Sequence, residues 1–567
     1  MNHNSLSDIA PQRRVLAAAV ILCAVLAIQV TSGAYHRDFA THADEPAHFV
    51  TGVMIRDYLI TSLGSSPLQF AEEYYLHYPK VGIGHWPPAF YALQGIWYSV
   101  VGVSKTSATF LIGLISAGTA WCLYRRLSLR YGTPVCLATI VVFLGQPLIR
   151  NQTILIMSDM LVCLGTLLAV FAFSDFLESP GRKHAAAFVF WSSVSILTKP
   201  SAMALAVFVP VCVLLTRQIT VLKNWRLWAA GAAIGVLTAP WYLWTWAQGM
   251  GLHTHGSISR MVGASVRIGR RYHASDALLS AASWWLVVVS VLGCLSIVVA
   301  SRHQTADRDG GRFDAFAAIA LCCGTILFLF AAPINSAPRY FLPFLAGMMV
   351  LYARGLETLL RRMPGPKPFV WSVASCLIAL AVLTAPGSVT TPVTGYAAAA
   401  ESFGDPHPGR VTLVSSNPRG DGAFVAERLL RNRHRSEFVL RASKVVEQSS
   451  WSGGSYRVRF STTEQLSKYL NSVPVHYIVI DDFGHRSDAK LTHHELLKEL
   501  LVVSPEQYPL VAGFPVDCQG RRHEDAIRVY ENRSVRGRRP IRIELDMKAS
   551  LGRSLQLDSH DNDTPGQ

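Results

Sequence analysis

Charged residues are scarce in this chain of 567 residues: Asp, Glu, Lys and Arg make up only 16%, whereas half of the residues are hydrophobic. An average soluble domain has roughly a quarter charged residues. The sequence also lacks a Walker phosphate loop, a Gly-rich dinucleotide fingerprint and a Cys/His zinc pattern. The scarcity of charge indicates an integral membrane protein. The missing nucleotide-binding motifs argue against a nucleotide-sugar donor in the cytoplasm.

Cysteine is nearly missing outside the hydrophobic segments. Nine of the ten cysteines lie in apolar stretches, where a thiol behaves as a small apolar side chain. Only Cys518 lies in the more polar C-terminal region. Because a disulfide needs two cysteines, a disulfide framework is excluded in that region.

Long hydrophobic runs are what the chain has in abundance. Between Val15 and Pro386, apolar segments long enough to cross roughly 30 Å of hydrocarbon recur with short polar interruptions. We therefore expect a polytopic α-helical membrane protein with about eleven spans. The candidate spans are about 15–33, 88–124 with an interfacial lead-in, 133–149, 154–177, 185–198, 201–216, 227–246, 278–300, 313–332, 340–360 and 369–386.

The positive charges predict the orientation of these spans. Cytoplasmic loops of membrane proteins are enriched in Lys and Arg. With Arg13 and Arg14 inside, every alternate loop is basic, which predicts a cytoplasmic N-terminus and a C-terminal region outside the cell or in the periplasm. The loops assigned to the inside carry Arg125, Arg126, Arg130, Arg182, Lys183, Arg217, Lys223, Arg226, Arg302, Arg308, Arg312, Arg354, Arg361, Arg362 and Lys367.

A second set of cations breaks this rule, because it falls at the outer face. Fixed positive charge at that level would hold the phosphate of a lipid carrier and stabilise a leaving group. The alternative is that each side chain simply extends toward lipid headgroups. The set comprises Lys80, Arg150, Lys199, Arg260, Arg267, Arg270, Arg271 and Arg339.

The acidic pair Asp44 and Glu45 follows the first predicted span, at the outer face of the membrane. Adjacent carboxylates repel each other and are costly to desolvate near hydrocarbon. The pair therefore suggests a catalytic base or a cation site. A solvated helix N-terminus, where the helix dipole favours anions, is the structural alternative.

Five short motifs occur in order along this topology: Thr41–His48 with the acidic pair, Gly84–Tyr91 with Pro-Pro, Asn151–Met160, Leu197–Pro200 and Ala337–Pro343. Together they resemble the C-type glycosyltransferase (GT-C) superfamily. The likeness is strongest to the protein O-mannosyltransferases and the aminoarabinose transferase acting on lipid A. It covers about residues 10–390, and its specificity lies in the combination of motifs and topology.

The resemblance implies a role for each matching residue. Asp44 would be the catalytic carboxylate, Glu45 its partner and Asp159 a second outer-face acid. Lys199 and Arg339 would bind the carrier phosphate, and the further candidates for substrate binding are His85, Arg150, Arg260, Arg270 and Tyr340.

One departure from the relatives concerns the residue before Pro-Pro. The aminoarabinose transferases have Lys there, whereas this chain has His85-Trp86. The imidazole of His85 could donate a hydrogen bond to a phosphate or cap a turn. This departure leaves the donor and the acceptor open.

A divalent metal ion is a further open alternative. The carboxylates of Asp44, Glu45 and Asp159 could supply oxygen ligands, and histidines nearby in the sequence could supply nitrogen. The histidines concerned are His42, His48, His253 and His255.

The outer regions are expected to form loops and a separate domain. We expect a transmembrane domain over residues 1–395 with outer loops at about 34–87 and 247–277, the first with aromatic interfacial helices along the headgroups. Residues of about 400–545 alternate strand and helix patterns, with strands at 411–415, 475–480 and 526–530, and predict a soluble α/β domain. The polar tail 546–567 is predicted to be disordered.

These features together predict transfer of a sugar from a polyprenyl-phosphate carrier to a lipid, polysaccharide or protein acceptor at the outer face of the cell membrane. Such a reaction needs an activated acceptor hydroxyl on one side and a neutralised phosphate on the other. The alternatives are a transporter or flippase of lipid-linked saccharides, and a polymerase or ligase of surface polysaccharide. The net charge of +15 comes chiefly from the membrane part, so a nucleic-acid partner is not indicated.

Overall fold

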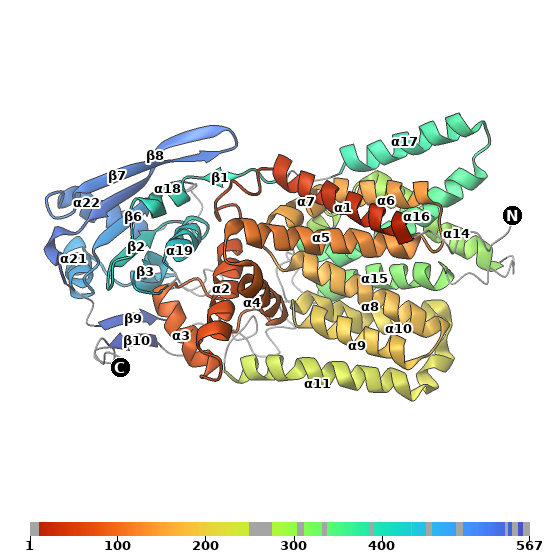
Figure 1. The fold of residues 1–567 in the computed structure, drawn as a ribbon, viewed down its shortest axis with the longest axis horizontal. Coiled ribbons are helices and arrows are strands. Elements are labelled where there is room, and N and C mark those ends of the chain that lie inside the picture. Colours follow the sequence, from red (N-terminus) through yellow and green to blue (C-terminus); the bar gives the residue numbers. More distant parts are fainter. Residues whose placement is uncertain are drawn as a thin grey trace.

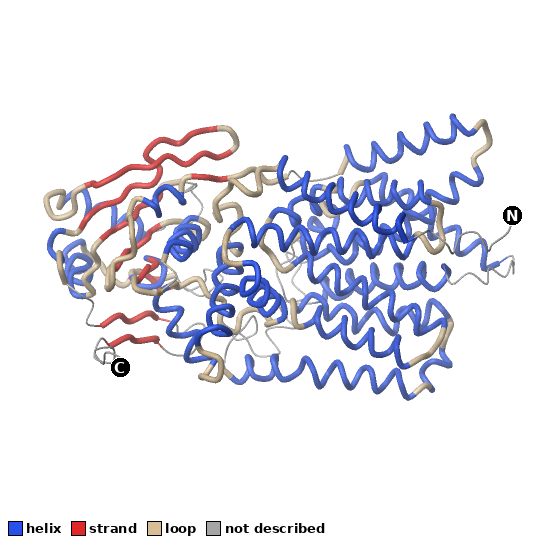
Figure 2. The backbone as a smooth tube through the Cα atoms, viewed as in Figure 1, coloured by secondary structure: helices blue, strands red, loops and turns tan. Residues whose placement is uncertain are grey.

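The protein is divided into a bundle of helices and a sheet-containing domain at one end of that bundle, as Figures 1 and 2 show for a computed structural model. Helices α2 (Glu45–Thr61), α3 (Pro67–His77) and α4 (Ala89–Val101) lie between the two parts. The structure describes residues 11–248, 275–302, 311–331, 337–385, 387, 389–432, 434–448, 456–483, 492–538, 542–546 and 554–558.

A helix lies in each of the predicted spans. Five described helices are long and apolar enough to cross a membrane, and the bent pair α6 and α7 makes a sixth if its 68° break is counted within one span. The number eleven therefore stays a prediction, since several other helices are shorter. The bundle contains α1 (Pro11–Thr31), α5 (Lys105–Leu127), α6 (Thr133–Gly145), α7 (Pro147–Ile154), α8 (Asp159–Glu178), α9 (Arg182–Ile196), α10 (Ala204–Thr216), α11 (Trp225–Ala247), α14 (Trp284–Arg302), α15 (Gly311–Ala331), α16 (Leu342–Arg362) and α17 (Lys367–Leu383).

The predicted segment 88–124 contains two helices, and the second of them, α5, is long and apolar enough to cross a membrane. Gly102 ends α4 with a φ of +95°, a conformation that glycine adopts without steric cost. Ser104 then caps α5 by accepting a hydrogen bond from the backbone N–H of Ser107 at 3.0 Å. As a result α4 packs against α2 instead of continuing into α5.

Helix α16 lies at the centre of the bundle, and its residues from Leu342 to Ala353 are all buried. It approaches α14 closely because glycines face each other. A Cβ atom on Gly355 would lie 1.9 Å from the carbonyl oxygen of Val289, and one on Gly293 would lie 2.2 Å from that of Leu351. Small residues of this kind let helix backbones meet in a membrane, where no hydrophobic effect drives them together.

The C-terminal domain is built on a six-stranded sheet, which confirms the predicted α/β class. Its strand order is β1-β7-β8-β6-β2-β3, with β2 parallel to β3 and β6, and the remaining pairs antiparallel. The predicted strands coincide with or overlap β2, β6 and β8. The sheet consists of β1 (Val393–Thr394), β2 (Val411–Ser415), β3 (Phe438–Arg441), β6 (Tyr477–Asp481), β7 (Leu510–Cys518) and β8 (Arg521–Glu531), and helices α18 (Tyr396–Glu401), α19 (Gly420–Arg431), α20 (Ala442–Val445), α21 (Thr463–Ser472) and α22 (Thr492–Val503) belong to the same domain.

Part of the segment 546–567, for which the sequence predicts a disordered tail, forms a strand. Strand β10 (Ser554–Asp558) pairs antiparallel with β9 (Arg542–Asp546). The pairing sets Leu555 opposite Leu545, and both side chains are buried. Burial of these two leucines stabilises the strand pair. The polar average composition of the segment gave no sign of this contact.

The aromatic outer loop also differs from its prediction. Tyr74, Tyr75 and Tyr78 are buried in a core shared with the C-terminal domain instead of lying along lipid headgroups. The ring of His77 stacks on Phe438 at 4.3 Å between ring centroids. The sequence pattern is ambiguous here because amphipathic aromatic side chains suit both a headgroup layer and a protein interface.

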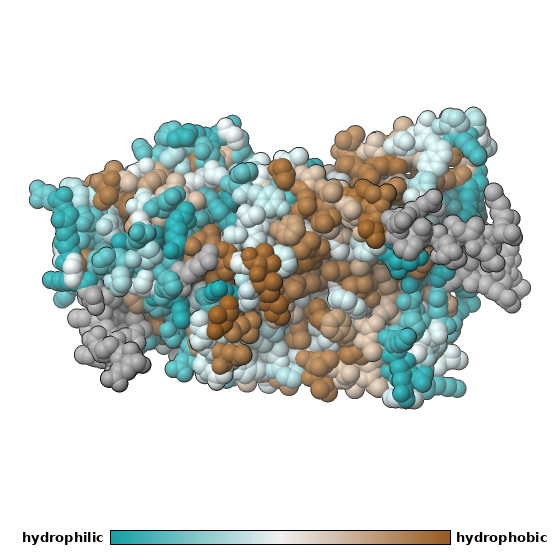
Figure 3. All heavy atoms as spheres, in the orientation of Figure 1, coloured by the Kyte–Doolittle hydropathy of each residue, from teal (hydrophilic) through white to brown (hydrophobic). Residues whose placement is uncertain are grey.

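The surface separates into hydrophobic and hydrophilic regions. In Figure 3, hydrophobic residues gather over the helical bundle, whereas hydrophilic residues gather over the C-terminal domain and at the opposite end of the bundle. Exposed side chains such as Val100, Val236 and Trp246 would contact lipid in this arrangement. Together with the apolar helices, this pattern identifies a multi-pass membrane protein.

The contact between α14 and α16 makes a prediction about stability. Gly355→Val should lower the midpoint of thermal unfolding in detergent, because overpacking a tight contact costs roughly 1–3 kcal/mol. Gly235→Val in α11 is the matched control, since a Cβ atom there meets no other atom within 4 Å. Equal midpoints for the two variants would contradict the close packing of α14 on α16.

Candidate functional site

Asp44 stands at the N-terminus of α2 with its carboxylate turned toward a cation from far along the chain. The side chain makes no capping hydrogen bond to its own helix. Instead the Nη2 of Arg339 donates to its Oδ2 at 2.9 Å, and the side chain of Asp44 is 25% exposed. The Nη1 of Arg339 also lies 2.6 Å from the Nε2 of His42.

The charges around Asp44 decide its protonation. Burial opposes ionisation of the carboxyl, but the surrounding cations, with Arg339 the strongest, outweigh it and hold the pKa of Asp44 below its usual value. Burial and Arg339 together lower the pKa of His42. Asp44 is therefore an ionised carboxylate at neutral pH, and His42 is a neutral imidazole.

Asp159 and Lys199 form a second ion pair, more deeply buried than the first. The Nζ of Lys199 donates to the Oδ1 of Asp159 at 2.6 Å, and the two side chains are 9% and 2% exposed. Asp159 is the first residue of α8, where the helix dipole favours an anion. Its Oδ2 is buried and has no hydrogen-bond partner among the described residues.

Tyr340 joins the two ion pairs into one site. The Nζ of Lys199 lies 4.5 Å from the centroid of the Tyr340 ring, and the guanidinium carbon of Arg339 lies 5.4 Å from it. Arg339 and Tyr340 belong to the short helix η4 (Pro338–Phe341), which leads directly into α16. Two cations near one aromatic ring are both attracted by its π electrons, which favours their staying close to each other.

Glu45 follows Asp44 in the chain but has different partners. Its carboxylate is fully buried and accepts two hydrogen bonds from the guanidinium of Arg37. The Oε1 of Glu45 also accepts from the backbone N–H of Ile156 at 2.9 Å, and Arg37 donates to the carbonyl of Ile154. Glu45 thus ties the start of α2 to the segment that connects α7 with α8. The sequence did not predict this role of Arg37, because a basic residue eight positions before an acidic residue is a weak signal of an ion pair.

The motif before Pro-Pro packs around His48. The rings of Trp86 and His48 stack at 4.4 Å, and the ring of His85 meets the edge of Trp86 at 4.6 Å. The Nδ1 of His48 lies 2.7 Å from the hydroxyl of Tyr91. Burial lowers the pKa of His85 to about 4 and that of His48 to about 3, so both imidazoles are neutral.

The remaining residues that were predicted to bind phosphate lie in different surroundings. Arg150 lies on α7, which contacts η4, and its Nε is buried without a hydrogen-bond partner among the described residues. Lys80 has a protein partner instead of an open position, since its Nζ lies 3.4 Å from the Oδ1 of Asp421 in the C-terminal domain. Arg260 and Arg270 lie outside the described residues, as do His253 and His255.

The predicted metal ligands do not converge. Among the residues that the structure describes, no group of three or more His, Cys, Asp or Glu side chains could hold a metal ion. Glu45 is turned to Arg37, while Asp44 and Asp159 each contact a cation. A cation such as Arg339 within hydrogen-bond distance of a carboxylate takes the place that a metal ion would need. The described residues of this arrangement therefore do not fit a metal ion.

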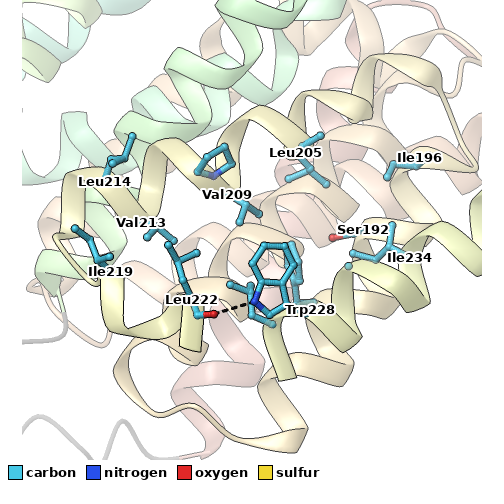
Figure 4. Close-up of a pocket in the computed structure, with 15 residues that line it drawn as sticks. Ser192, Ile196, Leu205, Val209, Val213, Leu214, Ile219, Leu222, Trp228 and Ile234 are labelled. Atoms are coloured by element: carbon cyan, nitrogen blue, oxygen red, sulfur yellow. Dashed lines mark hydrogen bonds between the residues drawn. The ribbon is translucent and has the colours of Figure 1, made fainter. Parts of the chain in front are cut away.

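An apolar cavity of about 570 Å³ lies between α9, α10 and α11 (Figure 4). Its lining is almost entirely aliphatic and aromatic. The indole of Trp228 forms part of the wall, and its Nε1 donates to the carbonyl of Leu222 at 2.8 Å. Of the lining residues on α9, Ile196 is the nearest in sequence to Lys199, and the lining on α10 extends from Leu205 to Leu214.

Comparison with solved structures places this geometry in a known fold. A crystal structure of ArnT from Cupriavidus metallidurans bound to undecaprenyl phosphate is similar, with a TM-score of 0.53, 13% identity, and coverage of 93% of this chain and 99% of that one. The same protein in the apo state gives a TM-score of 0.49 at 11% identity over 92% of this chain and 97% of that one.

A mutant of the arabinofuranosyltransferase AftD from Mycobacteria gives a TM-score of 0.46 at 13% identity, covering 92% of this chain and 42% of that one. A scan against protein-family models and a search of curated protein sequences gave no match. The likeness to ArnT bound to undecaprenyl phosphate, over nearly the full length of both chains, shows that this protein has the fold of that structure, in agreement with the GT-C-like architecture that the sequence motifs predict.

Proposed function

We propose that the protein transfers a sugar from a polyprenyl-phosphate carrier to an acceptor at the outer face of the membrane. The observation that carries this proposal is the meeting of Arg339 and Lys199 at Tyr340, with each cation held by one acid of the site. The GT-C fold supports it, and the ArnT structure with that fold was solved with undecaprenyl phosphate.

Arg339 and Lys199 bind the phosphate of the donor in this mechanism. As the bond between the anomeric carbon and the phosphate oxygen breaks, negative charge grows on the departing phosphate. A guanidinium and an ammonium group fixed at that point stabilise the charge without reorganisation, which is the largest contribution that most active sites make. Arg339 offers paired N–H donors that suit two phosphate oxygens.

Asp44 accepts the proton of the acceptor hydroxyl. It is the more exposed of the two acids, at 25% against 2% for Asp159, so an acceptor reaches it more readily. Arg339 holds the pKa of Asp44 low, and a carboxylate with a low pKa is a weak base. When a donor phosphate draws the guanidinium of Arg339 to itself, the pKa of Asp44 rises and the carboxylate becomes a stronger base. Donor binding thereby prepares the site for the acceptor.

The apolar cavity beside α9 and α10 takes part of the isoprenoid chain in this proposal. A polyprenyl chain is purely hydrocarbon and needs an apolar surface that is open to the membrane. One of its lining residues, Ile196, is close in sequence to the phosphate ligand Lys199. The outer-face location rests on the distribution of Lys and Arg between the loops.

Removal of the Asp44 charge tests the catalytic assignment. Asp44→Asn keeps the size of the side chain and should lower the transfer rate by about 100-fold or more, the usual contribution of a positioned base. The rate is measured as release of undecaprenyl phosphate in membrane vesicles that hold the endogenous donors and acceptors. Asp405→Asn, at an exposed position of the C-terminal domain, is the control. A near wild-type rate for Asp44→Asn would leave Asp159 as the next candidate for the base.

Neutral replacements of the two cations test donor binding. Arg339→Gln and Lys199→Gln should each weaken binding of undecaprenyl phosphate about 10-fold, as expected for loss of one charge-assisted contact. Arg339→Gln should also move the acidic limb of the kcat/KM profile to higher pH, because loss of the cation raises the pKa of Asp44. Unchanged binding in both variants, measured by calorimetry, would refute their role as phosphate ligands.

Glu45 is expected to act through stability and not through chemistry. Glu45→Gln leaves the guanidinium of Arg37 without a counter-charge, and breaking a buried ion pair costs about 3–5 kcal/mol. The thermal unfolding midpoint should therefore fall well below that of Asp44→Asn, whose side chain is partly exposed. A Glu45→Gln protein of normal stability and abolished transfer would show that Glu45 takes part in the reaction directly.

A further inference from the structure

The N-terminus of α19, in the C-terminal domain, packs directly against the segment that carries Asp44. A Cβ atom on Gly422 would lie 2.6 Å from the Cγ of Pro46 and 2.5 Å from the Cε of Lys80. Pro46 is two residues from Asp44, and its ring is rigid. Only a glycine therefore lets α19 approach α2 as closely as it does.

Lys80 is held between the outer loop and α19 by a buried ionic cluster. Its Nζ donates to the carbonyl of Pro418 at 3.0 Å and lies 3.4 Å from the Oδ1 of Asp421. The Oδ2 of Asp421 accepts from the Nε of Arg441 at 2.7 Å, and Arg441 donates to the carbonyl of Pro79 at 3.1 Å. Asp421 thus forms an ion pair with one cation on each side of the contact between the outer loop and the C-terminal domain.

The segment that follows Lys80 wraps the first turns of α2. The backbone N–H of Gly82 donates to the hydroxyl of Thr51 at 2.9 Å. The indole of Trp86 then stacks on His48, whose backbone N–H donates to the carbonyl of Asp44 at 3.0 Å. Packed side chains and hydrogen bonds therefore connect Asp421 to the backbone of Asp44 without interruption.

The rest of the domain contact keeps α19 from moving away. The Nδ1 of His77 lies 2.9 Å from the carbonyl oxygen of Glu437, and the hydroxyl of Tyr78 donates to the carbonyl of Asn432 at 2.5 Å. Both contacts are buried. Because protein interiors are close-packed, an atom added at the N-terminus of α19 must displace Pro46, Lys80 or α19 itself.

We propose that Asp421 and Gly422 are positioning residues for the reaction: through Lys80 and Pro46, the C-terminal domain sets the place of the Asp44 carboxylate relative to the donor. The inference rests on the proposed function, because it needs Asp44 to be the base. The two residues touch neither donor nor acceptor. Their effect is on the geometry of proton transfer, where a displacement of about 1 Å can cost up to about 100-fold in rate.

The test measures the transfer rate at saturating donor for Gly422→Ala and for Asp421→Asn, together with binding of undecaprenyl phosphate. Each variant should lower the rate about 10-fold or more and leave the affinity within about twofold, because the phosphate ligands Lys199 and Arg339 lie on other segments. Loss of affinity in proportion to the loss of rate would overturn the inference.

The same two substitutions are then combined with Asp44→Asn. If the two residues act by positioning Asp44, neither substitution should lower the residual rate of Asp44→Asn by more than about twofold. The reason is that the effects of substitutions that act through one group are not additive. A general structural effect would lower the rate by the same factor in both backgrounds and would refute positioning. An Asp44→Asn protein with a wild-type rate would instead refute the role of Asp44 as the base, which is the part of the proposed function on which the inference rests.

Two matched controls exclude trivial effects of the substitutions. Gly235→Ala, in α11, adds a methyl group to a helical glycine whose surroundings are open. Asp482→Asn removes a carboxylate that Lys498 and Arg528 hold within the C-terminal domain, away from α2. Both should transfer sugar at the wild-type rate, and a loss equal to that of Gly422→Ala would contradict a specific role for the α19 contact.

Discussion

The site depends on the pairing of buried carboxylates with cations from distant parts of the chain. An acid near hydrocarbon is stable as an anion only when a counter-charge and hydrogen bonds compensate its lost hydration. Asp44 meets Arg339 across 295 positions of the sequence, and Asp159 meets Lys199 across 40. Each pair joins two segments at the end of the bundle that faces the C-terminal domain, so the pairing fixes where α2, α8, η4 and α16 lie relative to one another.

The same pairing gives the site its chemistry. Without a donor the four charged groups neutralise each other, while the Oδ2 of Asp159 and the Nε of Arg339 are buried without hydrogen-bond partners among the described residues. A phosphate that arrives at the two cations competes with the two acids for them. Under the proposed function, this exchange of one anion for another lets a buried site bind a charged lipid and release a carboxylate for proton transfer in one step.

The sequence predicted the parts of the fold that follow from local pattern. Apolar runs gave the helices, and strand β2 was predicted residue for residue, because hydrophobic periodicity is a local property. The resemblance marked Asp44, Asp159, Lys199 and Arg339, which the structure brings to one place. Partners could not be predicted, since the sequence does not say that Glu45 meets Arg37 or that Lys80 meets Asp421. The break at Gly102 and the burial of Tyr74 likewise depend on tertiary contacts.

A structure of the protein in a lipid nanodisc with undecaprenyl phosphate tests the central claim most directly. The account predicts that the phosphate lies within hydrogen-bond distance of the Nζ of Lys199 and the guanidinium of Arg339, and that Arg339 has left Asp44. A phosphate bound elsewhere, with the contact between Arg339 and Asp44 unchanged from its 2.9 Å, would contradict the account.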